Sequence, residues 1–274
     1  MSSLLKFFSA VLVGMFLHCS SGQAQSAMAE FEGLDDGELD ESIDFVIGNA
    51  MFVIMHEAGH MLVSEFGLPV LGREEDAVDS LSALIMLEAD DEVFDQALID
   101  ASDGWFLSGE LTEEYSFWGE HSVDDQRAYA IVCMMVGQDA EQFGDLEAAQ
   151  ELPEERRESC AHEYQRVSES WTSVLEPHTR KNGGESNIEI VYDDAASPEL
   201  EPYAAMFREG DLLSLAKLVA DQYRLEDGIT FRATSCGVEN AFWSPSERTL
   251  TYCYELSRFH AKLVGDYFRK VAAE

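Results

Sequence analysis

His56, Glu57 and His60 are the residues of this 274-residue chain whose types and spacing best suit chemistry, because they form the pattern H-E-x-x-H. On a helix, residues four positions apart lie on one face, so both imidazoles can reach one metal ion. Glu57 would then lie beside a water molecule that zinc activates, and its carboxylate could accept the proton. The flanking residues are apolar, which disfavours an ordinary polar turn because unpaired polar groups are costly to bury. The pattern therefore predicts a zinc site suited to hydrolysis.

A third protein ligand is needed, because a catalytic zinc takes three side chains and keeps one position open. Glu75 and Asp79 lie four residues apart and so share one face of the next predicted helix. We expect Glu75 to bind the metal and Asp79 to accept the spare ring N–H of a ligand histidine. Glu74 points away from this face and Asp76 is short, so both are expected to be solvated residues of an acidic helix start.

Hydrolysis also requires a group that stabilises the oxyanion of the tetrahedral intermediate. His121 is our candidate for this role, because it precedes a predicted helix start and has polar neighbours; a surface or capping role is the alternative. Tyr115, Arg127 and Tyr129 are rivals. The aromatic stretch 105–118 is expected to pack in the core or to line a substrate cleft. Three further histidines have no partner pattern and are expected to be structural or exposed: His162, His178 and His260.

The elements that must position these residues follow from hydrophobic periodicity and turn signals. A long, nearly all-apolar helix is predicted over residues 42–66, ended by Gly67 and Pro69, and a second helix over 73–88. Further helices are expected at 92–103, after a capping box that begins at Ser122, after Pro153, and at 199–224.

The character of the sequence changes after a linker at residues 180–187. Residues 188–192, 229–234 and 248–254 are rich in β-formers, and the last two flank a turn region, so we expect them to form a hairpin. The chain then comprises an acidic leader (25–41), a helical metal-binding domain (42–180) and a smaller α+β lobe (188–274), either separate or packed into the same domain. The predicted fold class is α+β.

Five cysteines are present, and Cys19 lies in the N-terminal segment. The four others, in a chain expected to be exported, predict two disulfides, for which three pairings are possible. We favour the sequence neighbours, Cys133–Cys160 and Cys236–Cys253; free buried thiols are the alternative.

The N-terminus and the charge indicate where the protein works. Residues 1–24 are typical of a cleaved secretory signal, with Lys6 before a short apolar stretch, which predicts a periplasmic or secreted protein without stable membrane insertion. Lipid attachment at Cys19 is disfavoured because His18 precedes it. The 17 Lys and Arg against 54 Asp and Glu give a net charge of −37, which disfavours nucleic-acid partners and anionic membrane surfaces. Oligomeric state leaves no signature in the sequence.

Four stretches also resemble a bacterial family of metallopeptidases that is otherwise a domain of unknown function: HEAGHMLVSEFGLPVLGREEDAVD, FWGEHSVDDQRAYAIVCMMVG, LPEERRESCAHEY and CGVENAFWSPSERTLTYCYEL. The order H-E-x-x-H then E-x-x-x-D is similar to the gluzincin branch of zinc peptidases. The resemblance covers residues 45–256 and implies a zincin-like fold and a peptidase, with no departure at His56, Glu57, His60 or Glu75.

Three functions are compatible with these residues. The first is an exported zinc peptidase that uses Glu57 as general base on a peptide or protein substrate. The second is a catalytically silent, zinc-stabilised envelope binding protein, and the third is a zinc hydrolase of cell-wall amide bonds. The segment 240–256 is expected to be a disulfide-tied hairpin; pairing with an extended peptide substrate, with Asn240 and Glu255 supplying polar contacts, is the alternative.

Overall fold

The computed structural model describes residues 28–112, 117–181 and 183–273, so the expected signal peptide, Cys19 and Tyr115 lie outside the described residues. The helices are α2 (Asp36–Phe66), α3 (Glu74–Glu88), α4 (Glu92–Glu110), α5 (Asp124–Gln138), α6 (Ala140–Phe143), α7 (Glu147–Glu151), α8 (Glu154–Leu175), α9 (Glu201–Glu209), α10 (Leu213–Ala220) and α11 (Tyr254–Val271), with 3-10 turns η3 (Ala29–Phe31) and η4 (Glu176–His178). The strands are β1 (Ile188–Tyr192), β2 (Ile229–Thr234), β3 (Ala241–Ser244) and β4 (Thr249–Cys253). The fold class is α+β, as predicted.

The central helix α2 begins earlier than predicted, at Asp36 rather than at residue 42. A capping box explains this start: the Asp35 carboxylate accepts hydrogen bonds from the backbone N–H groups of Gly37 and Glu38, and the Glu38 carboxylate accepts one from the N–H of Asp35. Its C-terminal end is as predicted, because Gly67 adopts the left-handed conformation with φ 57°. By length and composition α2 is the one described helix that could cross a membrane, but 83% of its apolar window is buried inside the fold.

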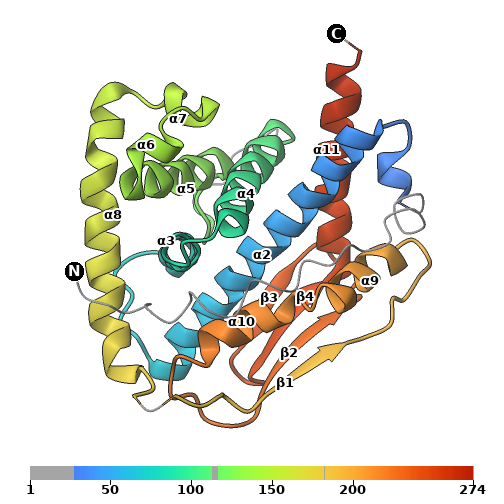
Figure 1. The fold of residues 1–274 in the computed structure, drawn as a ribbon. Helices are drawn as coiled ribbons and strands as arrows, with labels where there is room; N and C mark the ends of the chain where they lie inside the picture. The colour runs from blue at the N-terminus through green and yellow to red at the C-terminus, as the bar shows by residue number, and fades with distance from the viewer. Residues whose placement is uncertain (1–27, 113–116, 182, 274) are drawn as a thin grey trace.

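The other elements pack around α2, which runs diagonally through the centre of the molecule (Figure 1). The helices α3, α4, α5 and α8 lie on one side, and the sheet with α9 and α10 lies on the other. One hydrophobic cluster extends over both sides and includes Leu62 of α2, Leu84 of α3 and Phe231 of β2. The H-E-x-x-H helix is therefore held between the helical layer and the sheet.

A disulfide joins α5 to α8 through Cys133 and Cys160, which confirms the predicted pairing. The predicted capping box before α5 is wrong, because Val123 is the N-cap and no side chain caps the helix. The Ser122 hydroxyl instead accepts a hydrogen bond from Arg73, at the start of α3. A contact between remote segments has thus replaced the local one.

Gly137 allows α5 and α8 to approach closely beside this disulfide. A Cβ at Gly137 would lie 2.4 Å from the carbonyl oxygen of Cys160, which belongs to the backbone and has little room to move. We therefore expect Gly137→Ala to lower the free energy of unfolding by about 2–3 kcal/mol. Urea denaturation measures this change. Gly37→Ala is the matched control, because its Cβ would meet nothing closer than 3.4 Å; equal stability of the two variants would contradict the prediction.

The sheet has the strand order β1-β2-β4-β3, and its topology corrects the predicted hairpin. Strands β2 and β4 pair in parallel, with Thr230 opposite Thr249, whereas β3 pairs antiparallel with β4. The hairpin is therefore β3–β4, and it lies within the segment 240–256 that was also expected to form one. The predicted disulfide Cys236–Cys253 is confirmed, but it links the segment after β2 to the end of β4 rather than closing the predicted hairpin.

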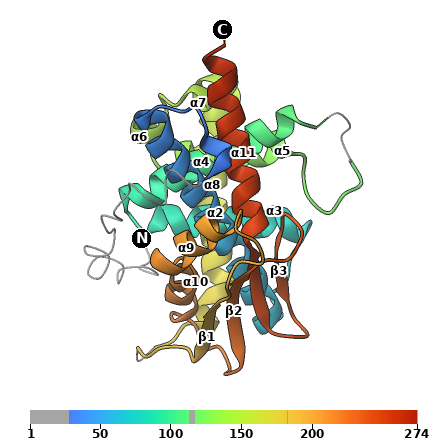
Figure 2. The same ribbon diagram turned by 90° about the vertical axis from the view of Figure 1, so that its right-hand side faces the viewer.

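Two further features complete the second layer. The helix predicted over 199–224 is two helices, α9 and α10, separated at Gly210 and Asp211, where Asp211 has φ 47°. In Figure 2, β1 and β3 lie on opposite sides of the sheet, so β3 is an edge strand. Because β3 also packs against α2, this edge lies next to the H-E-x-x-H motif.

Candidate metal centre

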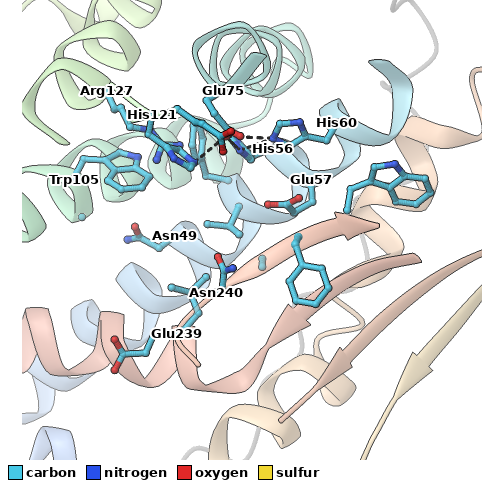
Figure 3. Close-up of a pocket in the computed structure, with 18 of the residues that line it drawn as sticks. Asn49, His56, Glu57, His60, Glu75, Trp105, His121, Arg127, Glu239 and Asn240 are labelled. Atoms are coloured by element: carbon cyan, nitrogen blue, oxygen red, sulfur yellow. Dashed lines mark hydrogen bonds and ion pairs between the residues drawn. The ribbon is translucent and has the colours of Figure 1, made fainter. Parts of the chain in front are cut away.

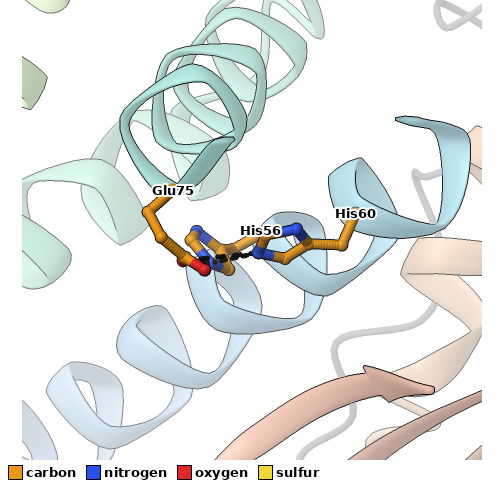
Figure 4. A group of neighbouring side chains, drawn as sticks. All are labelled: His56, His60 and Glu75. Carbon is orange, nitrogen blue, oxygen red and sulfur yellow. Dashed lines mark hydrogen bonds and ion pairs between the residues drawn. The ribbon is translucent and has the colours of Figure 1, made fainter. Parts of the chain in front are cut away.

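The three predicted metal ligands converge where α2 meets α3 (Figure 4). The Nε2 atoms of His56 and His60 are 3.1 Å apart, and Glu75 Oε2 lies 3.1 Å from the first and 3.3 Å from the second. Gly59, inside the motif, permits this approach, because a Cβ there would lie only 3.0 Å from the Cβ of Val78 on α3. The short helix contact therefore brings Glu75 to the two histidines.

The separations of these three ligand atoms suit a metal ion. Each of the three residues offers one ligand atom, and these three atoms lie within 4.8 Å of one another. In a tetrahedral site with bond lengths of about 2.0–2.1 Å, neighbouring ligand atoms are about 3.3 Å apart. The side chains of His56, His60 and Glu75 are 7%, 16% and 18% exposed. The residues thus fit a metal ion bound in a largely enclosed position.

Asp79 holds His56 in the orientation that the sequence predicted. His56 Nδ1 lies 2.7 Å from Asp79 Oδ1, which leaves Nε2 directed at Glu75 and His60. Burial alone would lower the pKa of His56, but the hydrogen bonds to Asp79 and Glu75 outweigh burial and raise this pKa to about 9. Asp79 is buried as well, yet the charge of Arg127 and the hydrogen bond with His56 lower its pKa to about 2.

Arg127 anchors Asp79, a role that the sequence did not reveal. Its Nε and Nη2 atoms each donate a hydrogen bond to the Asp79 carboxylate at 2.7 Å. Its guanidinium also lies 3.7 Å from the ring centroid of Trp105, in the aromatic stretch that was expected to pack in the core or to line a substrate cleft. Arg127 follows Asp79 by 48 residues, so no local spacing indicates the contact.

Glu74 was expected to be only a solvated residue of the helix start, but it contacts a predicted ligand histidine. His60 Nδ1 lies 2.8 Å from Glu74 Oε1, although the Glu74 side chain is 46% exposed. Each ligand histidine therefore has a carboxylate on its Nδ1, which directs Nε2 towards the metal position. The neighbouring Asp76 is exposed, as expected.

Glu57 lies between the ligands and the sheet. It is buried, with 6% of its surface exposed. Burial raises the pKa of its carboxyl group, while the charges of His56 and His60 and a backbone hydrogen bond from Trp243 lower it. Figure 3 shows the Glu57 carboxylate on the sheet side of α2, beside the metal ligands and not among them.

His121 reaches the metal centre from the loop before α5. Its Nε2 lies 2.9 Å from Glu75 Oε2, and its side chain is 53% exposed. Among the rivals for the oxyanion role, Arg127 is committed to Asp79, and the Tyr129 hydroxyl donates to Glu151. Tyr115 lies outside the described residues. Among the candidates that the structure describes, His121 is therefore the one whose side chain contacts Glu75 and has no other polar partner.

A cavity of about 660 Å³ opens in front of the metal centre (Figure 3). Its walls come from α2, α4 and α11 and from β3 with the residues before it. Glu57 and the three metal ligands line it, together with His121 and Arg127. His260, which was expected to be structural or exposed, also lines the cavity, as does Trp243 of β3.

Comparison with known proteins agrees with this geometry. A family model described as "Putative metallopeptidase" matches residues 17–175 and 192–272, which is most of the chain. No curated protein and no solved structure matches the chain. A metallopeptidase family implies a bound metal, and His56, His60 and Glu75 form a group that can hold one. The chain therefore belongs to this family of metallopeptidases.

Proposed function

We propose that the protein is an exported zinc-dependent peptidase. The observation that carries the proposal is the position of Glu57, a buried carboxylate beside three converged ligand atoms and open to one cavity. Two imidazoles and one carboxylate are a ligand set typical of catalytic zinc. The metal-binding group also follows the order of the gluzincin ligands, which supports a zincin-like fold for this family.

The residues of the chain divide the work of peptide hydrolysis. Bound zinc would polarise the substrate carbonyl and lower the pKa of a water molecule. The Glu57 carboxylate would take the proton from this water and deliver it to the leaving amine. The exposed His121 imidazole, held beside Glu75, would donate a hydrogen bond to the developing oxyanion. Asp79 and Glu74 would keep the ligand histidines oriented throughout.

The edge strand β3 supplies a surface for an extended peptide. The Asn240 carbonyl accepts a hydrogen bond from the N–H of Cys253. Because paired residues alternate in an antiparallel ladder, the backbone N–H and C=O groups of Phe242 also point towards β4. The backbone groups of Ala241 and Trp243 then face the open edge, on the side of Glu57, where the Trp243 N–H donates to the Glu57 carboxylate. A substrate strand could pair with the groups of this edge that do not bind Glu57 and present its scissile bond to the metal centre.

Export is proposed from the N-terminal signal pattern and is supported by the two disulfides, which form readily outside the cytoplasm. A peptidase in that location would meet peptides of the cell envelope or the surroundings. The chemistry of the site favours amide hydrolysis, and the peptide-binding edge favours peptides over other amides.

Metal content tests the proposal. We expect about one zinc per chain in the wild-type protein and at least about a 100-fold weaker zinc affinity in Glu75→Ala. Loss of a residue that only orients a ligand lowers metal affinity by about 10–100-fold, and this variant loses a ligand itself. Elemental analysis after zinc loading and removal of excess metal measures both. Asp76→Ala, which removes the neighbouring exposed carboxylate, should retain the zinc. A wild-type protein that holds no zinc would refute the proposal.

A further inference from the structure

The cavity has an acidic group at the end away from the metal ligands. Glu239 is exposed and lies two residues before β3, and Figure 3 shows it on the opposite side of the cavity from Glu75 and His121. Within the described residues, Glu239 has no hydrogen-bond or ion-pair partner. Its carboxylate is therefore free to bind a ligand at the start of the peptide-binding edge.

The cations near this position are already used. Arg127, the one Lys or Arg that lines the cavity in the described part of the chain, is bound to Asp79. A neighbouring hollow places Arg258 and Lys262 around Glu239, but Arg258 binds Glu30 and Lys262 binds Asp266. The cavity thus presents uncompensated negative charge at Glu239 and at Glu120, which also lines it.

Aromatic side chains also line the cavity that holds Glu239 and Glu57. Phe242 is 40% exposed, and Phe259 is a further lining residue. Trp243 is 9% exposed, and its Nε1–H finds no acceptor among the described residues. A bound peptide supplies carbonyl oxygens for such a donor, so this buried orphan is a second, independent indication of a ligand.

We propose that the cavity selects peptides with a Lys or Arg side chain and that Glu239 binds the cationic group. Lys and Arg have long apolar stems that pack on aromatic rings while their charged ends reach a carboxylate. Because a cleft with one sign of charge concentrates the opposite sign, acidic peptides would be disfavoured. This inference rests on the proposed function, since it assigns the substrate class of the same site.

The test measures peptide binding to the zinc-loaded, hydrolysis-deficient variant Glu57→Gln. The probes are fluorescent, end-blocked heptapeptides of alanine and leucine in which one position carries either Lys or its uncharged analogue norleucine, and this position is moved along the peptide. We expect the Lys peptide to bind about five-fold more tightly than its analogue at one or two positions, by fluorescence anisotropy at low salt. Adding Glu239→Gln should reduce this ratio to about one, and high salt should reduce it in the parent protein.

Glu158→Gln is the matched control, because it removes the same charge from an exposed position on α8, outside the cavity. It should leave the five-fold ratio unchanged. Equal binding of the two peptide series, no binding of either, or a ratio that survives Glu239→Gln would each overturn the inference. Zinc content of the same samples separates this result from failure of the proposed function, because a zinc-loaded protein without lysine preference refutes only the inference.

Discussion

Glu57→Gln is expected to lower peptide hydrolysis by at least about a thousandfold while zinc content stays at the wild-type level. Glutamine preserves the size of the side chain but cannot accept a proton from water at neutral pH. Glu57 does not belong to the group His56, His60 and Glu75 that can hold the metal, so metal binding should be unaffected. The comparison requires turnover of a peptide substrate and elemental analysis on the same preparations.

Asp76→Asn is the control for this variant, because it makes the same chemical change on an exposed carboxylate near the ligands. It should retain most of the activity. Full activity in Glu57→Gln would show that another group serves as the base. Loss of zinc in that variant would show that Glu57 supports the metal instead, and either result would refute the assigned role.

Asp100→Asn is expected to raise the free energy of unfolding at pH 8 and to have little effect near pH 4. Asp100 of α4 is buried against α2, where a Cβ at Gly48 would lie 2.2 Å from its Oδ2. Gln96 donates a hydrogen bond to it, and the charges acting on it are other carboxylates: Asp103, Asp44 and Glu41. Burial, reinforced by these like charges, raises the pKa of Asp100 to about 7.

The sign follows from proton binding. In the unfolded chain an Asp has a pKa of about 3.9, so between this value and about 7 the folded state holds a proton that the unfolded state has released. The free energy of unfolding therefore falls as pH rises through this window, and the contribution linked to Asp100 is fully lost above it. Asparagine removes the ionisation, with a gain at pH 8 of up to about 4 kcal/mol.

Urea denaturation of the wild type and Asp100→Asn between pH 4 and pH 8 checks this expectation. Some pH dependence should remain in the variant, because burial and nearby carboxylates also raise the pKa of Asp103 to about 6. Asp36→Asn, on an exposed carboxylate at the start of α2, should leave the wild-type profile unchanged. A wild-type stability that does not fall between pH 5 and pH 8 would contradict the argument.

Local spacing made much of the helical structure and the candidate ligands predictable. His56 and His60, like Glu75 and Asp79, are four residues apart, and helix geometry alone places each pair on one face. Gly67 ended α2 as predicted because glycine adopts the left-handed conformation at low cost. The two disulfides followed from cysteine number and sequence proximity. These features depend on residues close together in the chain.

The errors lie where segments distant in the chain compete with local preference. The strands β2 and β4 looked like a hairpin, yet the chain between them forms β3 and returns, so they pair in parallel. Ser122 was expected to cap α5 but binds Arg73 instead. In each case a hydrogen bond to a distant segment formed in place of the predicted local one. A pattern of neighbouring residues contains no information about such distant partners.

Helical periodicity is a property of the local backbone, so the H-E-x-x-H motif and the shared helix face of Glu75 and Asp79 could be predicted from spacing alone. Three contacts could not be predicted from spacing: Arg127 binds Asp79, Glu74 binds His60, and β3 borders the cavity beside Glu57. These contacts arise from the packing of α3, α5 and the sheet against α2. Such packing depends on the shape and burial of whole elements, which no single stretch of sequence contains.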